Sequence, residues 1–370
     1  MKIGILTLQY GANYGGTLQC FALYKILQDL GYDVEVINFI PTIVAPRYKR
    51  LIYNLSMARS FQEFFETIKR MFKPKRHKLL DPNIISVFER FRSKNIKLTP
   101  MVNELSISTL NNRFDTIIIG SDQVWSSMVR SHLTYFGDWK PKYSGKLLSY
   151  AACSYTDKYP YVRKDRLKAL INSFSAISVR DNLTRSLIDK FYNSEISLVA
   201  DPTLLYDFNN FITPAIINEP YILTYILGHE ICGGNINAIK VIKEKLHINK
   251  VVAITLNGND IPYADITMKS SSPEEWVNLI ANAGCVYTDS FHGVIFSLKF
   301  KKRFIAYYQD KLRASRLIDI QERFNLRINI ITHLNQIEQM STSDFEISDS
   351  VTCCINNLIQ ESKNFLINNL

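Results

Sequence analysis

The feature that most constrains the fold is a pair of apolar runs separated by a glycine-rich break and a helical repeat in residues 1–39. Residues 3–6 indicate a buried strand, and residues 33–39 indicate a second one. Between them, apolar side chains recur at helical spacing up to a stop at Gly31, namely Leu18, Ala22, Leu23, Ile26, Leu27 and Leu30. A strand-helix-strand unit of this kind favours a parallel sheet, in which functional loops follow the carboxyl ends of the strands.

The break before the helix has the sequence GANYGG, residues 11–16. Gly15 and Gly16 relieve the steric limits on the backbone where the helix begins, and free N–H groups at a helix start suit an anion or a hydroxyl-rich ligand. The glycines lack the G-x-G-x-x-G spacing of a dinucleotide site. Two interpretations stay open, a ligand-binding turn and a tight turn that serves only the path of the chain.

Length and composition indicate a globular protein of two domains. A chain of 370 residues is too long for one ordinary core, and 46% apolar with 21% charged residues is usual for soluble proteins. No apolar run reaches transmembrane length, and the N-terminus lacks the layout of a signal peptide, so we expect a cytoplasmic protein. The six cysteines are scattered without a C-x-x-C pair, which fits reduced thiols better than a zinc site or a disulfide framework, and we expect no metal site.

The net charge of +10 is concentrated in residues 41–100, which contain 14 Lys and Arg against 4 Asp and Glu. Within this segment, residues 51–78 combine an apolar helical stripe with a basic end. Such a helix suits an anionic membrane surface, which would place the protein peripherally on the inner face of the plasma membrane, or a polyanionic partner. The alternative is an ordinary helix packed on the first domain. Nucleic acid is not an expected partner, because no binding motif accompanies the charge.

Further strands of the first half of the chain end in polar loops. Residues 117–119 form a strand that is followed by Asp122 and Gln123, and two later strands end at Ser154 and Arg180. A parallel sheet brings these ends to the edge where open α/β proteins bind their ligands. Each residue also has a structural alternative, because Asp and Ser commonly cap helices and Arg commonly forms surface ion pairs.

A second set of strands and helices follows the first. The first domain closes where Asp201 and Pro202 end a strand and open a linker. In the second set, a strand ending near residue 288 precedes a helix over 294–300, which leaves Ser290 and His292 on the loop between them. We therefore expect domains at 1–200 and 201–345, and a helix in 346–370 that crosses back to the first domain.

Six segments occur in an order and spacing typical of one family. They are NYGGTLQCFALYKIL, IIIGSDQVWS, SVRDN, ADPTLL, SPEEWVNLI and YTDSFHGVIFSL. Together they resemble the polysaccharide pyruvyl transferases. The resemblance implies two Rossmann-like α/β domains facing a cleft, similar to the GT-B glycosyltransferase fold, with the acceptor side on the first domain and the donor side on the second.

The resemblance also implies the reaction. Pyruvate would pass from phosphoenolpyruvate, as co-substrate, to two hydroxyls of a hexose, forming a cyclic ketal and releasing phosphate. The hexose would belong to a bacterial surface polysaccharide or to its lipid-linked precursor. This reaction needs no cofactor beyond the co-substrate.

The donor carries a carboxylate and a phosphate, which guanidinium groups hold best. The resemblance places Arg180, Arg316, Ser290 and His292 on this donor. His292 is also the predicted acid-base residue, because it alone of the six histidines lies in a polar strand-end loop within a family motif. The alternatives are a structural histidine and structural ion pairs for the arginines.

On the acceptor side, the resemblance implies that Asp122 and Gln123 orient the sugar hydroxyls. Asp122 is the second predicted catalytic residue, as a base, with helix capping as its alternative. Asn13, Gly15 and Gly16 would complete this side of the cleft.

Two other classes of function remain open. A GT-B glycosyltransferase that uses a nucleotide sugar would share the architecture, and an inverting enzyme of that class needs no metal-binding Asp-x-Asp motif. A non-catalytic glycan-binding or scaffold protein is the third class.

Overall fold

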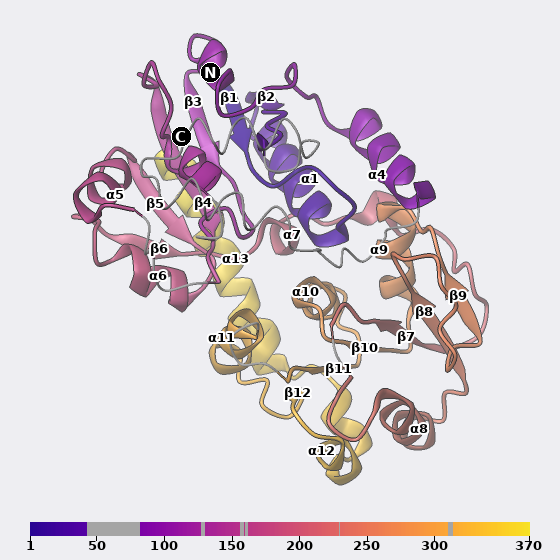
Figure 1. The fold of residues 1–370 in the computed structure, drawn as a ribbon. Coiled ribbons are helices and arrows are strands. Elements are labelled where there is room, and N and C mark those ends of the chain that lie inside the picture. The colour runs from indigo at the N-terminus through magenta and orange to yellow at the C-terminus, as the bar shows by residue number, and fades with distance from the viewer. Residues whose placement is uncertain (43–81, 127–129, 156–158, 160–161, 229, 310–313) are drawn as a thin grey trace, which may run out of the picture.

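The computed structural model describes residues 1–42, 82–126, 130–155, 159, 162–228, 230–309 and 314–370. Within these ranges the chain forms two parallel sheets of six strands each, flanked by helices (Figure 1). The predicted fold class is confirmed. The predicted helix over residues 51–78, with its basic end, lies outside the described residues, and its proposed contact with a membrane or a polyanion stays a prediction.

The first sheet has the strand order β2-β1-β3-β4-β5-β6. Its strands are β1 (Lys2–Leu6), β2 (Asp33–Val36), β3 (Thr116–Ile119), β4 (Lys146–Ala152), β5 (Ala176–Val179) and β6 (Ile196–Leu198). Its helices are α1 (Tyr14–Asp29), α4 (Pro82–Asn95), η2 (Ile107–Leu110), η3 (Arg130–Phe136), α5 (Lys164–Ile171) and α6 (Asn182–Ile188). Ile118 packs into the apolar cluster on one face, and Ile117 and Ile119 pack into the cluster on the other. The alternation of side chains along a strand thus buries β3 on both faces.

The segment between the sheets contains α7 (Pro202–Leu205) and η4 (Asn209–Phe211). The second sheet has the order β12-β11-β10-β7-β8-β9. Its strands are β7 (Tyr221–Tyr225), β8 (Lys250–Ile254), β9 (Ile266–Met268), β10 (Cys285–Thr288), β11 (Phe304–Tyr307) and β12 (Ile330–Ile331). Its helices are α8 (Asn235–Leu246), α9 (Pro273–Asn282), α10 (Phe291–Lys299), α11 (Ser315–Arg323), α12 (Leu334–Gln339) and η5 (Thr342–Phe345), and α13 (Asp349–Asn369) follows.

The strand order reverses once in each sheet, between β1 and β3 in the first and between β7 and β10 in the second. Loops that leave two neighbouring strands in opposite directions open a crevice at such a point, which is where open α/β sheets bind ligands. In the first sheet the loops after β1 and β3 lead to Asn13 and Asp122. In the second, the turn after β10 leads to Ser290 and His292. The reversal points therefore position the predicted site.

Aromatic side chains hold the two domains together. The ring of Tyr14, in the first turn of α1, stacks on Trp276 of α9 with centroids 5.3 Å apart. Its hydroxyl donates a hydrogen bond of 2.7 Å to the carbonyl oxygen of Ser271. Phe208 packs against Phe296 of α10 at 5.1 Å. One apolar cluster thus includes residues of both domains, so the contact between the domains resembles a protein core more than a wet interface.

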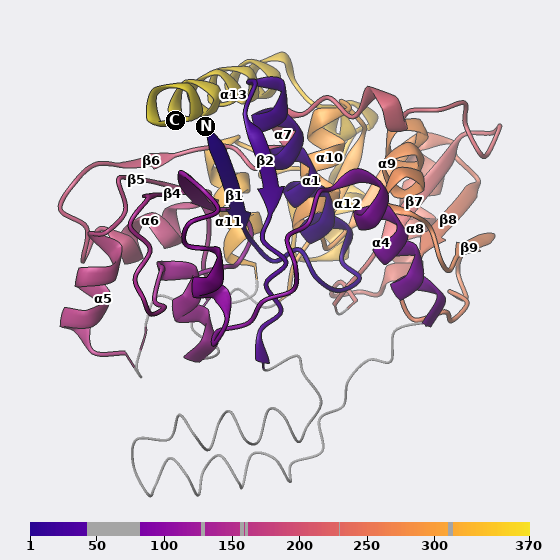
Figure 2. The same ribbon diagram turned by 90° about the horizontal axis from the view of Figure 1, so that it is seen from above.

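Helix α13 leaves the second domain and reaches back to the first (Figures 1 and 2). The hydroxyl of Ser362 accepts a hydrogen bond of 2.8 Å from the backbone N–H of Ala200, which follows β6. Phe365 lies 6.3 Å from the ring of Tyr150 in β4. The helix is amphipathic because apolar residues recur every three or four positions and face the two domains.

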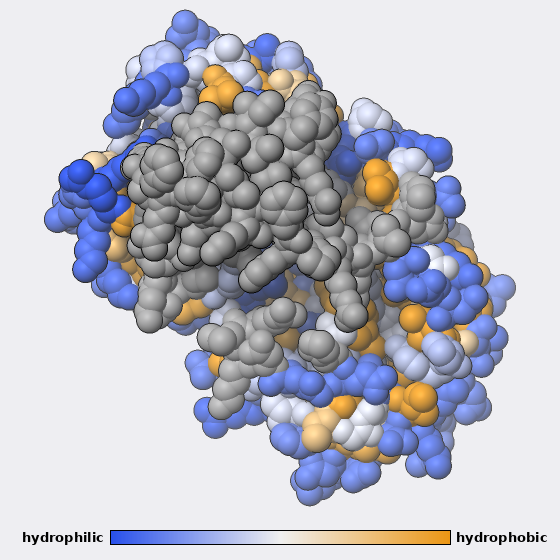
Figure 3. Space-filling model, viewed as in Figure 1, coloured by the Kyte–Doolittle hydropathy of each residue, from blue (hydrophilic) through white to orange (hydrophobic). Residues whose placement is uncertain are grey.

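The outer surface of the described residues is mainly hydrophilic on the face shown in Figure 3, with hydrophobic side chains interspersed. None of the helices in the described part of the chain combines the length and apolar character needed to cross a bilayer.

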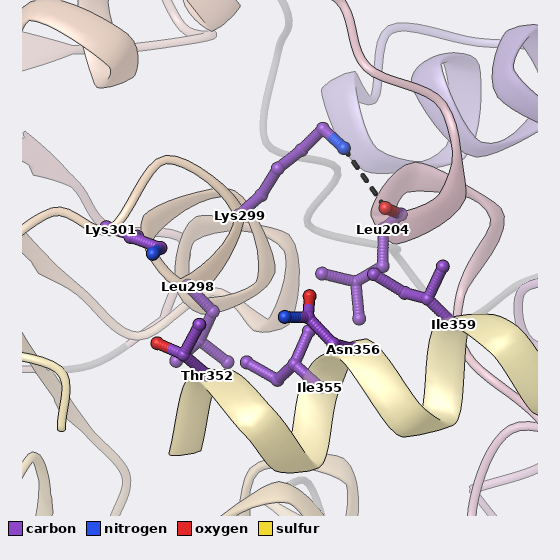
Figure 4. A pocket seen from close by; sticks show the side chains of 8 residues that line it. All are labelled: Leu204, Leu298, Lys299, Lys301, Thr352, Ile355, Asn356 and Ile359. Carbon is purple, nitrogen blue, oxygen red and sulfur yellow. Dashed lines mark hydrogen bonds between the residues drawn. The ribbon is translucent and has the colours of Figure 1, made fainter. Parts of the chain in front are cut away.

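A small cavity lies where α7, α10 and α13 meet (Figure 4). Its lining consists of Leu204, Leu298, Lys299, Lys301, Thr352, Ile355, Asn356 and Ile359. The ammonium group of Lys299 donates a hydrogen bond of 3.1 Å to the carbonyl oxygen of Leu204. Burial lowers the pKa of Lys299 to about 8, although Asp207 opposes the shift. A charged group is thus held in a place that disfavours its charge.

This lysine makes stability depend on pH. Between pH 8 and pH 10.5 the unfolded chain keeps a proton on Lys299 that the folded chain has lost. The contribution of Lys299 to stability therefore rises with pH in this window, by on the order of 1–3 kcal/mol.

In Lys299→Met this contribution is absent, so the variant should exceed the wild type in stability at pH 7 and lose that advantage by pH 9.5. Denaturant unfolding at both pH values measures the difference. Lys301→Met, at the exposed mouth of the cavity, should show the same stability difference from wild type at both pH values; an equal pH trend in the two variants would contradict the assignment.

Candidate active site

The buried ion pair of Asp201 and Arg180 lies at the centre of the site. Nη1 of Arg180, just after β5, lies 2.5 Å from Oδ2 of Asp201, and both side chains are almost fully buried. The hydroxyl of Ser121 donates to the same oxygen over 3.2 Å. Burial alone would raise the pKa of Asp201, but His292 and the Arg180 guanidinium hold that pKa well below its ordinary value. Asp201 is therefore an anion that cannot be reached by solvent.

Asp201 was not among the site residues predicted from the sequence, which assigned it to the start of a linker. Its other oxygen, Oδ1, accepts hydrogen bonds from the backbone N–H and the hydroxyl of Thr203, at 3.0 and 2.7 Å. These contacts make Asp201 the N-cap of α7, with Pro202 in the first turn. The dipeptide Asp-Pro is a helix-start signal that can be recognised in the sequence. The ion pair of Asp201 with Arg180, 21 positions away, cannot be recognised there.

Asp122 follows β3 in a left-handed backbone conformation with φ of 76°. This conformation is unfavourable for most residues and more readily adopted by Asp and Asn. It turns the carboxylate toward two guanidinium groups, with Oδ1 at 3.5 Å from Nη2 of Arg180 and 3.9 Å from Nη1 of Arg316. Gln123, the next residue, is partly buried, and its backbone carbonyl accepts from Ser126.

The two predicted donor arginines approach the same aromatic ring, that of Phe291 at the start of α10. The guanidinium carbon of Arg180 lies 4.3 Å from the ring centroid, and that of Arg316 lies 5.3 Å away. Their surroundings differ. Arg180 is buried and its two terminal nitrogens contact Asp201, Asp122 and the sulfur of Cys153. Arg316, in the first turn of α11, keeps 23% of its side chain exposed, so it is the more accessible of the two cations.

His292 lies in the first turn of α10 and is 6% exposed. The expectation of a loop here was wrong, because α10 begins at Phe291 and not near residue 294. Ser290 is its N-cap and accepts a hydrogen bond of 3.4 Å from the N–H of Gly293. Nε2 of His292 lies 3.6 Å from Oδ2 of Asp201. The second domain thus places its imidazole against the ion pair of the first.

The helix of the first domain begins at Tyr14, earlier than the apolar repeat indicates, because the side chain of Asn13 caps it by accepting a hydrogen bond of 3.0 Å from the N–H of Gly16. Gly15 and Gly16 are therefore helical and are not needed for an unusual turn. A Cβ atom at Gly15 would lie 1.9 Å from Nδ1 of His292. The glycine is required by the close approach of this imidazole.

The site thus brings Asp201, at the start of α7, together with seven of the predicted residues. These come from the start of α1, the ends of β3 and β5, and the first turns of α10 and α11: Asn13, Gly15, Gly16, Asp122, Arg180, His292 and Arg316. A model of the family described as "Polysaccharide pyruvyl transferase" matches residues 13–311. This chain belongs to the polysaccharide pyruvyl transferase family.

Comparison with solved structures identifies the fold of this family member. A putative UDP-N-acetylglucosamine 2-epimerase from Listeria monocytogenes matches with a TM-score of 0.53 and 9% identity, over 99% of this chain and 94% of that one. Arabidopsis thaliana UGT89C1, complexed with quercetin, matches with 0.50 and 11%, over 99% and 98%. Anabaena Alr3699/HepE, in complex with UDP and glucose, matches with 0.50 and 9%, over 100% and 98%. The family member therefore has the GT-B fold. No curated protein matches this chain.

The contact of Gly15 with His292 can be tested by adding one methyl group. Gly15→Ala should lower the free energy of unfolding by about 1–3 kcal/mol, because the imidazole or α1 must move. Gly16→Ala is the matched control in the same turn, since its Cβ would meet its nearest atoms at 3.4 Å. Alanine should there be neutral or stabilising by up to about 1 kcal/mol. Denaturant unfolding compares the two, and equal stabilities would show that the close approach is wrong.

Proposed function

We propose that this family member transfers pyruvate from phosphoenolpyruvate to two hydroxyls of a hexose in a bacterial surface polysaccharide or its lipid-linked precursor. The product is a cyclic ketal, and phosphate is released. The observation that supports this function best is the meeting of His292 and Asp122, from the reversal points of the two sheets, with Arg180 and Arg316. An imidazole among guanidinium groups suits proton transfer to a substrate with two anionic groups.

In this proposal, Arg316 is the arginine that binds the donor directly. Its guanidinium is partly exposed, and within the described residues the carboxylate that it pairs with is that of Asp122, at 3.9 Å. Such a distant ion pair leaves the planar fork free to bind a carboxylate or phosphate with two parallel hydrogen bonds. Arg180 contributes its positive charge without direct contact with the donor, because it is buried and its two terminal nitrogens already contact Asp201 and Cys153.

The chemistry requires one proton to be delivered to carbon and one to be removed from each of the two sugar hydroxyls. C3 of the enol gains a proton from His292, the π electrons of the double bond form the new C–H bond, and C2 becomes oxocarbenium-like. One sugar hydroxyl adds to C2 and loses its proton. The second hydroxyl then replaces the phosphate, which leaves with the C2–O bond electrons and a proton. In this proposal Asp122 accepts a hydroxyl proton, and its position near the start of α1, with a carboxylate oxygen 3.4 Å from the Cβ position of Gly16, supports this role.

The acceptor would bind on the first-domain side. Gln123 and Asn13 flank Asp122 and the start of α1, and their amides can donate to and accept from hydroxyl groups. Asn13 already caps α1 through its oxygen, which leaves its NH₂ group for a ligand. A lipid-linked acceptor would agree with peripheral placement at a membrane through residues 41–100.

A choice of donors tests this function against the alternative. The protein is incubated with a lipid-linked glycan and either phosphoenolpyruvate or a panel of nucleotide sugars, and the acceptor is analysed by mass spectrometry. We expect the mass of one pyruvyl ketal and release of phosphate with phosphoenolpyruvate alone. A hexose increment from a nucleotide sugar would instead support a GT-B glycosyltransferase. No product with any donor would support a binding protein.

The role of Arg316 leads to a second test. Arg316→Lys keeps the positive charge but loses the bidentate fork, so KM for phosphoenolpyruvate should rise by about 10-fold or more while KM for the acceptor changes little. Arg327→Lys, an exposed position beyond α11, is the matched control and should leave both constants unchanged. Steady-state kinetics with each substrate varied gives both values. A rise confined to the acceptor KM would move Arg316 to the other substrate.

A further inference from the structure

Asp201 contacts Arg180, Ser121 and His292 through one oxygen atom. Oδ2 lies 2.5 Å from Nη1 of Arg180, 3.2 Å from the hydroxyl of Ser121 and 3.6 Å from Nε2 of His292. Oδ1 is held by Thr203. The side chain of Asp201 is fully buried, so it cannot touch a substrate. Any effect of Asp201 on the reaction must pass through the groups that it holds.

The two nitrogens of the His292 ring face different parts of the protein. Nε2 faces Asp201, is buried, and has no hydrogen-bond partner within the described residues. Nδ1 faces the first turn of α1, at the place where a side chain at Gly15 would be. A buried carboxylate attracts the N–H form of the nitrogen that faces it, which leaves the lone pair of a neutral imidazole on the other nitrogen.

We propose that Asp201 is a positioning residue that keeps the ring proton of His292 on Nε2 and presents Nδ1 as the atom that exchanges protons with the substrate. The proton exchange with the substrate rests on the proposed function, whereas the tautomer rests on the positions of His292, Asp201 and Gly15.

The other charged groups around His292 do not provide this selection. Arg180 and Arg316 are cations, which repel an N–H group. The carboxylate of Asp122 lies on the side of the two arginines and near α1, with Oδ1 at 3.5 and 3.9 Å from their nitrogens. Within the described residues, Asp201 is the acidic group that contacts the imidazole, with Oδ2 3.6 Å from Nε2.

The tautomer can be measured without any substrate. Nitrogen NMR of the full-length protein with ¹⁵N-labelled histidine gives one pair of ring signals for each of the six histidines, and His292→Asn identifies its pair by loss. In the wild type at a pH where the ring is neutral, we expect a pyrrole-type Nε2 and a pyridine-type Nδ1. In Asp201→Asn, the neutral amide can turn either its oxygen or its NH₂ group to the ring, so the Nδ1–H form should become populated. A wild-type ring with its proton on Nδ1 would overturn the proposal.

The kinetic test separates positioning from a general effect on folding. Asp201→Asn should lower kcat by about 10²- to 10⁴-fold, the range of a lost proton transfer, with little change in KM for phosphoenolpyruvate. The same change in the His292→Asn background should have almost no further effect, since Asp201 acts through that ring. Losses that multiply in the double variant would refute positioning.

A second variant covers the case in which Asp201→Asn does not fold. Thr203→Val removes one anchor of the carboxylate but keeps the charge, and should lower kcat several-fold in the wild type and not in the His292→Asn background. Equal losses in both backgrounds would overturn the proposal. If phosphoenolpyruvate gives no product at all, the proposed function fails, and the ring signals still decide the role of Asp201.

Discussion

The arrangement of the site depends on one buried charge pair, Asp201 with Arg180. Taking two ions out of water costs several kcal/mol each, and a pair of this kind is seldom a net source of stability. Its effect is instead on geometry, because removing either partner leaves an unpaired buried charge at a cost of about 3–5 kcal/mol. The pair ties the end of β5 to the start of α7, and Ser121 adds the end of β3. Three segments of the first domain are thus held in one arrangement before the imidazole of the second domain meets them.

The second domain is held against that pair by contacts of different character. Tyr14 and Trp276 supply stacked apolar area, while α11 supplies polar contacts on the opposite side of the site. The carboxylate of Asp319 accepts from the backbone and the side chain of Asn182, both at 2.9 Å, and Arg323 donates to the carbonyl of Arg180 at 2.9 Å. Since α11 also carries Arg316, the helix that presents the accessible cation is attached to the strand end that carries the buried one. Distances across the site are set by both domains together.

Much of this could be predicted from the sequence, and the failures have physical causes. Buried apolar strands and the loops after them were found because burial on both faces gives continuous apolar runs, and Asp122, Arg180 and His292 follow such strands. The start of α1 was predicted too late, because a capping Asn and two glycines precede the apolar repeat. Strands β11 and β12 and helix α11 were not predicted, and of these only β12, with two residues, is too short for its periodicity to be distinctive. The roles of Asp201 and Gly15 depend on residues far away in the chain, and no local pattern encodes such a contact.

The return of α13 has a consequence for biosynthesis. The backbone N–H of Ala200 finds its partner in Ser362, and Tyr150 lies near Phe365, so the first sheet is completed by a helix that is translated after both sheets. On the ribosome, the early half of the chain therefore emerges with part of its apolar surface uncovered. That half can collapse but cannot reach its final packing until α13 has been made. Chaperone dependence and the yield of recombinant protein should be governed by this delay more than by the stability of the finished enzyme.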